Sequence, residues 1–141
     1  MLINERFNDF RFRSFFIEKE MICNYLVIFF QASSSGWISL TIDEGIAKFT
    51  KEFSEPNTLD LSEIFDDYAY PVQDATELSC YKGKKLINIY EHRIKGIEEG
   101  CIGIYFECED CGFTVLESDG CLSITHGFYE NFQEETHLVK L

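Results

Sequence analysis

The stretch YLVIFFQASSSGWISLTI, residues 25–42, decides the fold class. Its first part, Tyr25–Gln31, is rich in β-branched and aromatic residues, which are typical of a buried strand. Ser33–Gly36 then has the composition of a turn, and Trp37–Ile42 alternates apolar and polar side chains with the period of a strand. Because the connection is short, the stretch predicts an antiparallel hairpin.

Strand patterns continue on both sides of this hairpin. Upstream, Phe10 and Phe12 alternate with Arg11 and Arg13, which predicts a strand with one solvated face. Downstream, Ser118–Gly120 has the Asp-Gly composition of a hairpin turn, because these residues tolerate the positive φ that such turns require. Further strands are expected over residues 86–94, 101–108, 113–116 and 121–125.

Between residues 43 and 71 the period of the apolar residues changes from two to that of a helix. Ile46, Phe49 and Phe53 recur at i, i+3 and i+7, and Thr41 and Glu44 have the spacing of a capping box. This pattern predicts a first helix that ends before Pro56.

A second helix is expected just after Asp60, which is placed to cap it, with Glu63 three residues later and Pro71 closing it. Its apolar face is formed by Leu61, Ile64, Phe65 and Tyr68. The whole pattern predicts an α+β fold: a single domain over residues 1–141, with an antiparallel sheet of about six strands and two short helices inserted after the third strand.

Composition restricts the function classes. The chain has 141 residues, is 45% hydrophobic, and carries 12 Lys and Arg against 25 Asp and Glu, a net charge of −13. That charge argues against binding to nucleic acid or to an anionic membrane surface. The longest apolar run, residues 21–30, is too short to span a bilayer as a helix, and no export signal is convincing. We therefore expect a cytoplasmic protein whose six cysteines are reduced.

The negative charge is concentrated in two segments. Residues 36–80 carry ten acids against two Lys, and residues 98–141 carry ten acids against one Lys, whereas residues 81–97 are basic. On the second predicted helix the carboxylates of Asp60, Glu63 and Asp67 share one face, beside two tyrosines. This face is either a solvated surface or a docking site for a basic protein partner. The candidate binding residues are Asp60, Glu63, Asp66, Asp67, Tyr68, Tyr70 and Asp74.

The string CEDCG, residues 108–112, is the most motif-like in the chain. Cys108 and Cys111 have the spacing of half a zinc ribbon, and Cys101, Cys121 and His126 are the candidates for further ligands. The simpler interpretation is a pair of cysteines at a hairpin turn. No complete metal site, cofactor motif or catalytic signature is found, so we expect a protein that is not an enzyme and that has no metal or cofactor.

The acidic charge, the face around Asp60, Glu63 and Asp67 with Tyr68 and Tyr70, and the lack of a reaction motif resemble the immunity proteins of bacterial polymorphic-toxin and contact-dependent inhibition systems. The resemblance is one of overall character. It implies stoichiometric binding that neutralises a basic toxin domain, such as a nuclease. The alternatives are an adaptor or structural subunit of another assembly, and a small enzyme or ligand-binding protein that uses the cysteines and histidines.

Overall fold

The structure, a computed structural model, describes residues 2–141. It is built almost entirely of strands. They are β1 (Phe7–Ile17), β2 (Glu20–Ala32), β3 (Gly36–Asp43), β4 (Ile46–Lys51), β5 (Tyr68–Ala69), β6 (Val72–Asp74), β7 (Leu86–Ile94), β8 (Cys101–Cys108), β9 (Gly112–Ser118), β10 (Cys121–His126) and β11 (Thr136–Lys140). Two 3₁₀ helices, η1 (Leu61–Glu63) and η2 (Thr76–Tyr81), accompany them. Among residues 2–141, no helix has the length and apolar character needed to cross a membrane.

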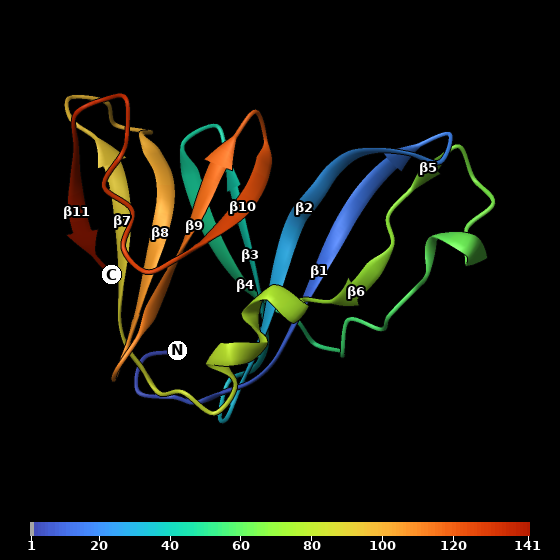
Figure 1. The fold of residues 1–141 in the computed structure, drawn as a ribbon, viewed down its shortest axis with the longest axis horizontal. Coiled ribbons are helices and arrows are strands. Elements are labelled where there is room, and N and C mark those ends of the chain that lie inside the picture. The colour runs from blue at the N-terminus through green and yellow to red at the C-terminus, as the bar shows by residue number, and fades with distance from the viewer. Residues whose placement is uncertain (1) are drawn as a thin grey trace.

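The eleven strands form one antiparallel sheet that curls into two halves (Figure 1). The N-terminal half runs β4-β3-β2-β1, with β5 and β6 on the outer edge of β1. The C-terminal half runs β11-β7-β8-β9-β10. A single residue pair, Tyr25 with Leu122, joins β2 to β10. Elsewhere the halves are linked by the Arg6–Lys85 bridge and by backbone hydrogen bonds between residues 4–7 and 83–86.

The predicted hairpin of residues 25–42 is confirmed, because β2 and β3 pair antiparallel from Ile28–Leu40 to Ala32–Gly36. The hairpin turn at Asp119 and Gly120 is also confirmed, since both residues have positive φ and join β9 to β10. In both places a local turn signal lies between two alternating segments, so the sequence alone specifies the pairing.

The main core lies between the two halves and is rich in phenylalanine. The rings of Phe106 and Phe113 stack with centroids 4.7 Å apart, and Phe30 lies 5.1 Å from Phe106. Phe7 and Phe10 contact the same group from β1. All five side chains are at most 1% exposed, so the two halves are held together mainly by apolar burial.

A smaller cluster lies on the outer face of the N-terminal half. Val27, Phe29, Trp37 and Val72 are buried there beneath the chain that connects β4 to β6. The backbone N–H of Glu52 donates to the carbonyl of Trp37 at 2.9 Å, which anchors the start of this connection. Further along, Leu59 of this connection forms a bridge with Val72, so the connection returns to the cluster although it contains little regular structure.

The α+β prediction is wrong, and so is the count of about six strands. The first predicted helix is the strand β4, which pairs with β3 over its whole length. Glu44 and Gly45 both have positive φ, at 50° and 78°, and form a two-residue turn that sends the chain back along β3. The period of Ile46, Phe49 and Phe53 does not reflect a buried helical face, because Phe53 is 97% exposed.

The second predicted helix is also wrong, since only η1 forms and Ile64 is already extended. Asp60 and Glu63 do form the expected capping box, with Ser62 N 3.2 Å from Asp60 Oδ2 and Asp60 N 3.1 Å from Glu63 Oε1. The helix stops because its apolar side chains have no surface to cover: Phe65 is 90% exposed. A short helix without such packing is marginal in water.

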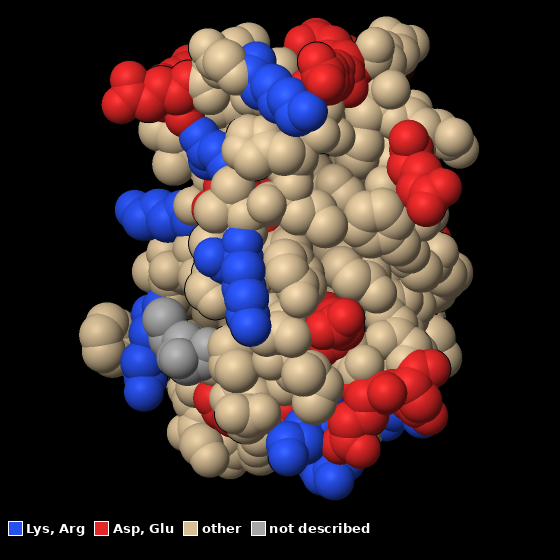
Figure 2. Space-filling view, turned by 90° about the vertical axis from the view of Figure 1, so that its left-hand side faces the viewer, with Lys and Arg blue, Asp and Glu red and all other residues tan. Residues whose placement is uncertain are grey.

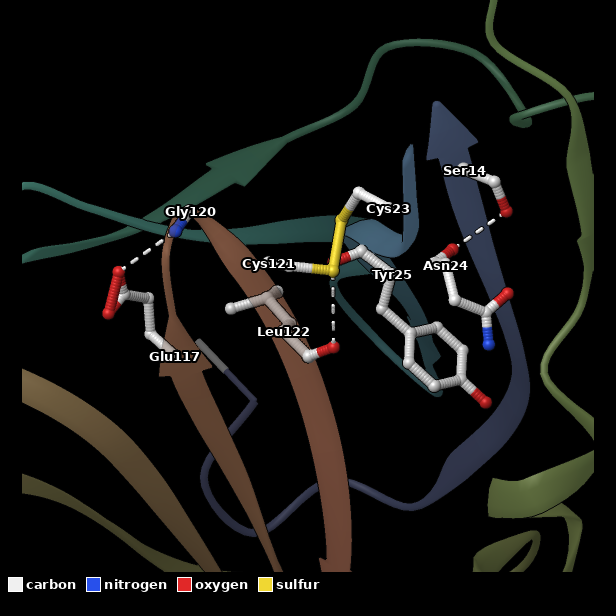
Figure 3. The surroundings of a disulfide bond; sticks show 8 residues. All are labelled: Ser14, Cys23, Asn24, Tyr25, Glu117, Gly120, Cys121 and Leu122. Atoms are coloured by element: carbon white, nitrogen blue, oxygen red, sulfur yellow. Dashed lines mark hydrogen bonds between the residues drawn. A yellow bond between two sulfur atoms is a disulfide. The ribbon is translucent and has the colours of Figure 1, made fainter. Parts of the chain in front are cut away.

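A disulfide between Cys23 of β2 and Cys121 of β10 lies beside the single pair that joins these two strands (Figure 3). The expectation that all six cysteines are reduced is therefore wrong for these two. Cys80, Cys101, Cys108 and Cys111 are free. The covalent bond reinforces a place where one residue pair joins the two strands.

The carboxylate of Glu5 ties the N-terminal segment to the β2–β3 turn. It accepts from the backbone N–H groups of Ser34 at 2.7 Å, Ser35 at 2.6 Å and Leu2 at 2.8 Å, and from the Ser35 hydroxyl. Partial burial raises the pKa of Glu5, but the hydrogen bonds from Ser35, Ser34 and Leu2 outweigh it and lower the pKa to about 2.

We predict that Glu5→Gln lowers the free energy of unfolding at pH 7 by about 1–3 kcal/mol, because a neutral amide accepts these bonds less well. Since the folded-state pKa is depressed, the stabilisation is present above the ordinary pKa of 4.5 and is lost as pH falls from there toward 2. Urea unfolding between pH 7 and pH 2 checks this. The difference in free energy of unfolding between wild type and variant must shrink as the pH falls. A difference that stays constant contradicts a depressed pKa of Glu5 as the source of the stabilisation.

Candidate functional site

The turn between β1 and β2 lies beside β5 at one end of the molecule (Figure 1). Tyr68 pairs with Ile17, and the N–H of Glu18 donates to the carbonyl of Asp67 at 2.7 Å. These bonds bring together two segments that are about fifty residues apart in the sequence. We call residues 15–22 and 65–70 the hairpin tip.

The hairpin tip exposes large apolar side chains. Phe65 is 90% exposed, Tyr68 62%, Met21 and Ile22 54% each, and Tyr70 47%. Tyr68 and Tyr70 both stack on Phe15, with ring centroids 6.2 Å and 5.0 Å away, so their rings are held in place rather than free to collapse. Fixed, exposed aromatic rings are the usual anchors of a protein interface.

The same two segments carry four carboxylates. Glu18, Glu20, Asp66 and Asp67 are all exposed, and none of them forms an ion pair within residues 2–141. Lys19 is the one basic residue of the tip sequence. On the opposite side of the molecule, the face near β7 and β11 shows Lys and Arg side chains among the acidic ones (Figure 2). The hairpin tip therefore combines exposed apolar side chains with four unpaired carboxylates, which we call the rim.

The structure separates the seven predicted binding residues. Asp66, Asp67, Tyr68 and Tyr70 lie together in the hairpin tip. Asp60 and Glu63 lie on η1, where each accepts a hydrogen bond from the backbone of the capping box, so the shared helical face predicted with Asp67 does not exist. Asp74 Oδ1 lies 3.5 Å from Arg11 Nε, which neutralises it within the protein.

Sequence reasoning missed Glu18, Glu20, Met21, Ile22 and Phe65 as members of the site. The first four fall in the apolar run and its acidic border, which the sequence suggests as a buried strand or an export signal but not as a binding surface. A signal was present, because two acids placed directly before an apolar run are unusual for a buried segment. It became informative only when β5 was paired with β1.

The cysteine motif lies at the other end of the sheet. Cys108 ends β8 and Cys111 directly precedes β9, so the prediction of two cysteines at a hairpin turn is confirmed. Burial raises the pKa of Cys108 to about 12 and also raises the pKa of Cys111, which keeps both thiols protonated at neutral pH. Within residues 2–141, no three metal-ligating side chains gather, and Cys121, a candidate ligand, is in the disulfide.

The histidines occupy two different environments. The hydroxyl of Tyr81 donates to the carbonyl of Gly112 at 3.0 Å, and its oxygen lies 2.6 Å from Nδ1 of His126, from which it then accepts. Burial raises the pKa of Tyr81, so the phenol stays protonated and fixes the C-terminal end of η2 to the sheet. His92 is 2% exposed and packs between Phe128 and Phe132, and burial lowers its pKa. Of the chain's three histidines, His92 is therefore part of the buried interior, and His126 is an exposed ring stacked on Tyr81.

Comparison of the chain with protein-family models, with curated proteins and with solved structures finds no match.

Proposed function

We propose that this protein binds a basic protein partner through the hairpin tip, and that it is an immunity protein that neutralises a toxin domain by stoichiometric binding. The observation that carries the proposal is the group of exposed, fixed rings together with the unpaired carboxylates of the rim. A monomer gains nothing from leaving such rings in water, and the rim repels acidic partners while it attracts basic ones.

The charge distribution supports a basic partner over a merely apolar one. The connection from Glu52 to Asp74, which leads into the tip, contains no Lys or Arg. The acids of this connection therefore add to the negative charge of the tip, against which Lys19 and Arg13 are the nearby cations without an ion pair among the described residues. Fields of this kind raise association rates by about 10 to 1,000-fold at low salt. A nuclease domain, whose substrate is a polyanion, offers the matching positive surface.

The test is co-expression with the product of the neighbouring upstream reading frame, with growth protection and complex formation by size-exclusion chromatography as readouts. A variant with Glu18→Gln, Glu20→Gln, Asp66→Asn and Asp67→Asn removes the rim. We predict that its association rate in 50 mM salt falls by about 10 to 100-fold, with little loss of fold stability.

The matched control changes Glu98, Glu99, Glu130 and Glu134 to Gln. These four acids also lie outside the ion pairs of residues 2–141 and remove the same charge from the other half of the protein. The control must associate at nearly the wild-type rate. An equal fall in both variants contradicts a role for the tip, and a stable complex without growth protection favours an adaptor over an immunity protein.

A further inference from the structure

An open groove of about 490 Å³ lies next to the hairpin tip on the outer face of the sheet. Its lining combines three aliphatic residues with an arginine, an asparagine and a tyrosine. The residues are Arg13, Leu26, Asn57, Leu59, Tyr70 and Val72. Tyr70 belongs to both the groove and the tip, so the two surfaces are continuous.

The polar group that stands out in the groove is the Arg13 guanidinium. It lies over the ring of Phe29, with its central carbon 5.2 Å from the ring centroid. This contact fixes the side chain but leaves its N–H donors unused: within residues 2–141, no carboxylate oxygen lies within 4 Å of it and no acceptor is hydrogen-bonded to it. Stacking on an aromatic ring leaves the edge of a guanidinium open to an anion.

Arg11, two residues along the same strand, has the intramolecular partners that Arg13 lacks, although its Nε forms no hydrogen bond within the described part of the chain. It lies 4.8 Å from the centroid of Trp37, donates to the carbonyl of Pro56 at 2.7 Å, and is within 4 Å of carboxylates of Asp9, Glu55 and Asp74. In a chain with 25 acids, Arg13 is the arginine without such a partner among the described residues. The difference marks Arg13 as a free cation in an acidic protein.

We propose that the groove receives an acidic side chain of the bound partner, and that Arg13 is a specificity-determining residue that forms an ion pair with it. This inference rests on the proposed function. A specific interface covers about 800 Å² of each partner. Because Tyr70 belongs to both surfaces, an interface on the tip continues into the groove. Covering an unpaired guanidinium removes its water, so the partner must supply the acceptor.

The apolar walls further define the occupant. Leu26, Leu59 and Val72 favour an apolar side chain next to the carboxylate, and Asn57 adds one amide that donates and accepts. The occupant is therefore an acidic residue beside an aliphatic one, on a partner that is basic overall. A basic protein without this acidic residue would leave Arg13 buried and unpaired in the interface, so the pair discriminates against such proteins.

The test uses the blocked dipeptides Ac-Leu-Glu-NH₂ and Ac-Leu-Gln-NH₂, which differ in the carboxylate alone. Each is titrated into the labelled full chain while NMR follows the Arg13 Nε–H signal and the methyl signals of Leu26, Leu59 and Val72. We predict that the Glu peptide binds at least about tenfold tighter than the Gln peptide. Arg13→Gln abolishes that preference, and Lys51→Gln, which removes a charge from the exposed end of β4, keeps it.

Equal binding of the two peptides to wild type overturns the proposal, as does a preference that survives in Arg13→Gln. Octanoate is the third probe. If it shifts the same signals at a tenfold lower concentration than the Glu peptide, the groove binds free fatty acids and the proposal of a partner side chain is overturned. None of these readouts uses the toxin or the rim carboxylates, so failure here is distinguishable from failure of the proposed function.

Discussion

Loss of the Cys23–Cys121 disulfide is expected to lower the free energy of unfolding by about 3–5 kcal/mol, because the bond closes a long loop in the unfolded chain. The two cysteines are 98 residues apart in the sequence. For a chain of this size the loss corresponds to a fall in melting temperature of about 10–20 °C. Circular dichroism melts of Cys23→Ser/Cys121→Ser against wild type measure it.

Two controls isolate the bond. Cys80→Ser changes an exposed, free cysteine and must melt like wild type. Dithiothreitol must lower the wild-type melting temperature and leave that of the double variant unchanged. If the double variant melts within about 2 °C of wild type, the disulfide adds no net stability, and the backbone contacts between the halves, with the core, are enough to hold them together.

Gly45→Ala is expected to be the most damaging small substitution in the chain. Gly45 has φ of 78°, and a Cβ built on it would lie 1.8 Å from the carbonyl oxygen of Glu99. Its own carbonyl accepts from the N–H of Cys101 at 3.0 Å, so the β3–β4 turn docks directly on the β7–β8 loop. A methyl group on Gly45 pushes the β3–β4 turn away from the backbone of the β7–β8 loop. We predict that the free energy of unfolding falls by at least about 3 kcal/mol.

Gly120→Ala is the matched control for this experiment. Gly120 also has φ of 78°, but a Cβ there meets no atom within 4 Å. It therefore carries only the strain of a left-handed conformation, about 1–2 kcal/mol. Urea unfolding of both variants separates the two costs. Equal losses would show that the β3–β4 turn shifts at little cost, and that its contact with the β7–β8 loop is weak.

The strands were predictable where a turn signal and an alternating pattern agree. At residues 25–42 and 113–125 both are local, so the sequence specified strand type and pairing. The segment from residue 46 failed because Ile46 and Phe49 fit a helical spacing as well as a strand. The choice between helix and strand is decided by the turn that precedes this segment, in which Glu44 and Gly45 have positive φ.

Only one of the two segments that form the hairpin tip could be predicted from the sequence. The residues Asp66–Tyr70 stand out as acids beside tyrosines in the sequence. The other segment, Glu18–Ile22, joins them through the pairing of β1 with β5, which is a contact between distant segments. No local pattern encodes such a contact, and it is also the reason that Arg13 and Tyr70 line one groove.

The position of the disulfide also governs how the protein is made. Cys23 leaves the ribosome early, whereas its native partner Cys121 is the last cysteine in the chain, and four other thiols are synthesised between them. Oxidation of the nascent chain therefore offers Cys23 four wrong partners before the right one exists. Once β8 is folded, Cys101 and Cys108 are buried and protonated, and they no longer compete. Recombinant production should consequently delay oxidation until the sheet has closed.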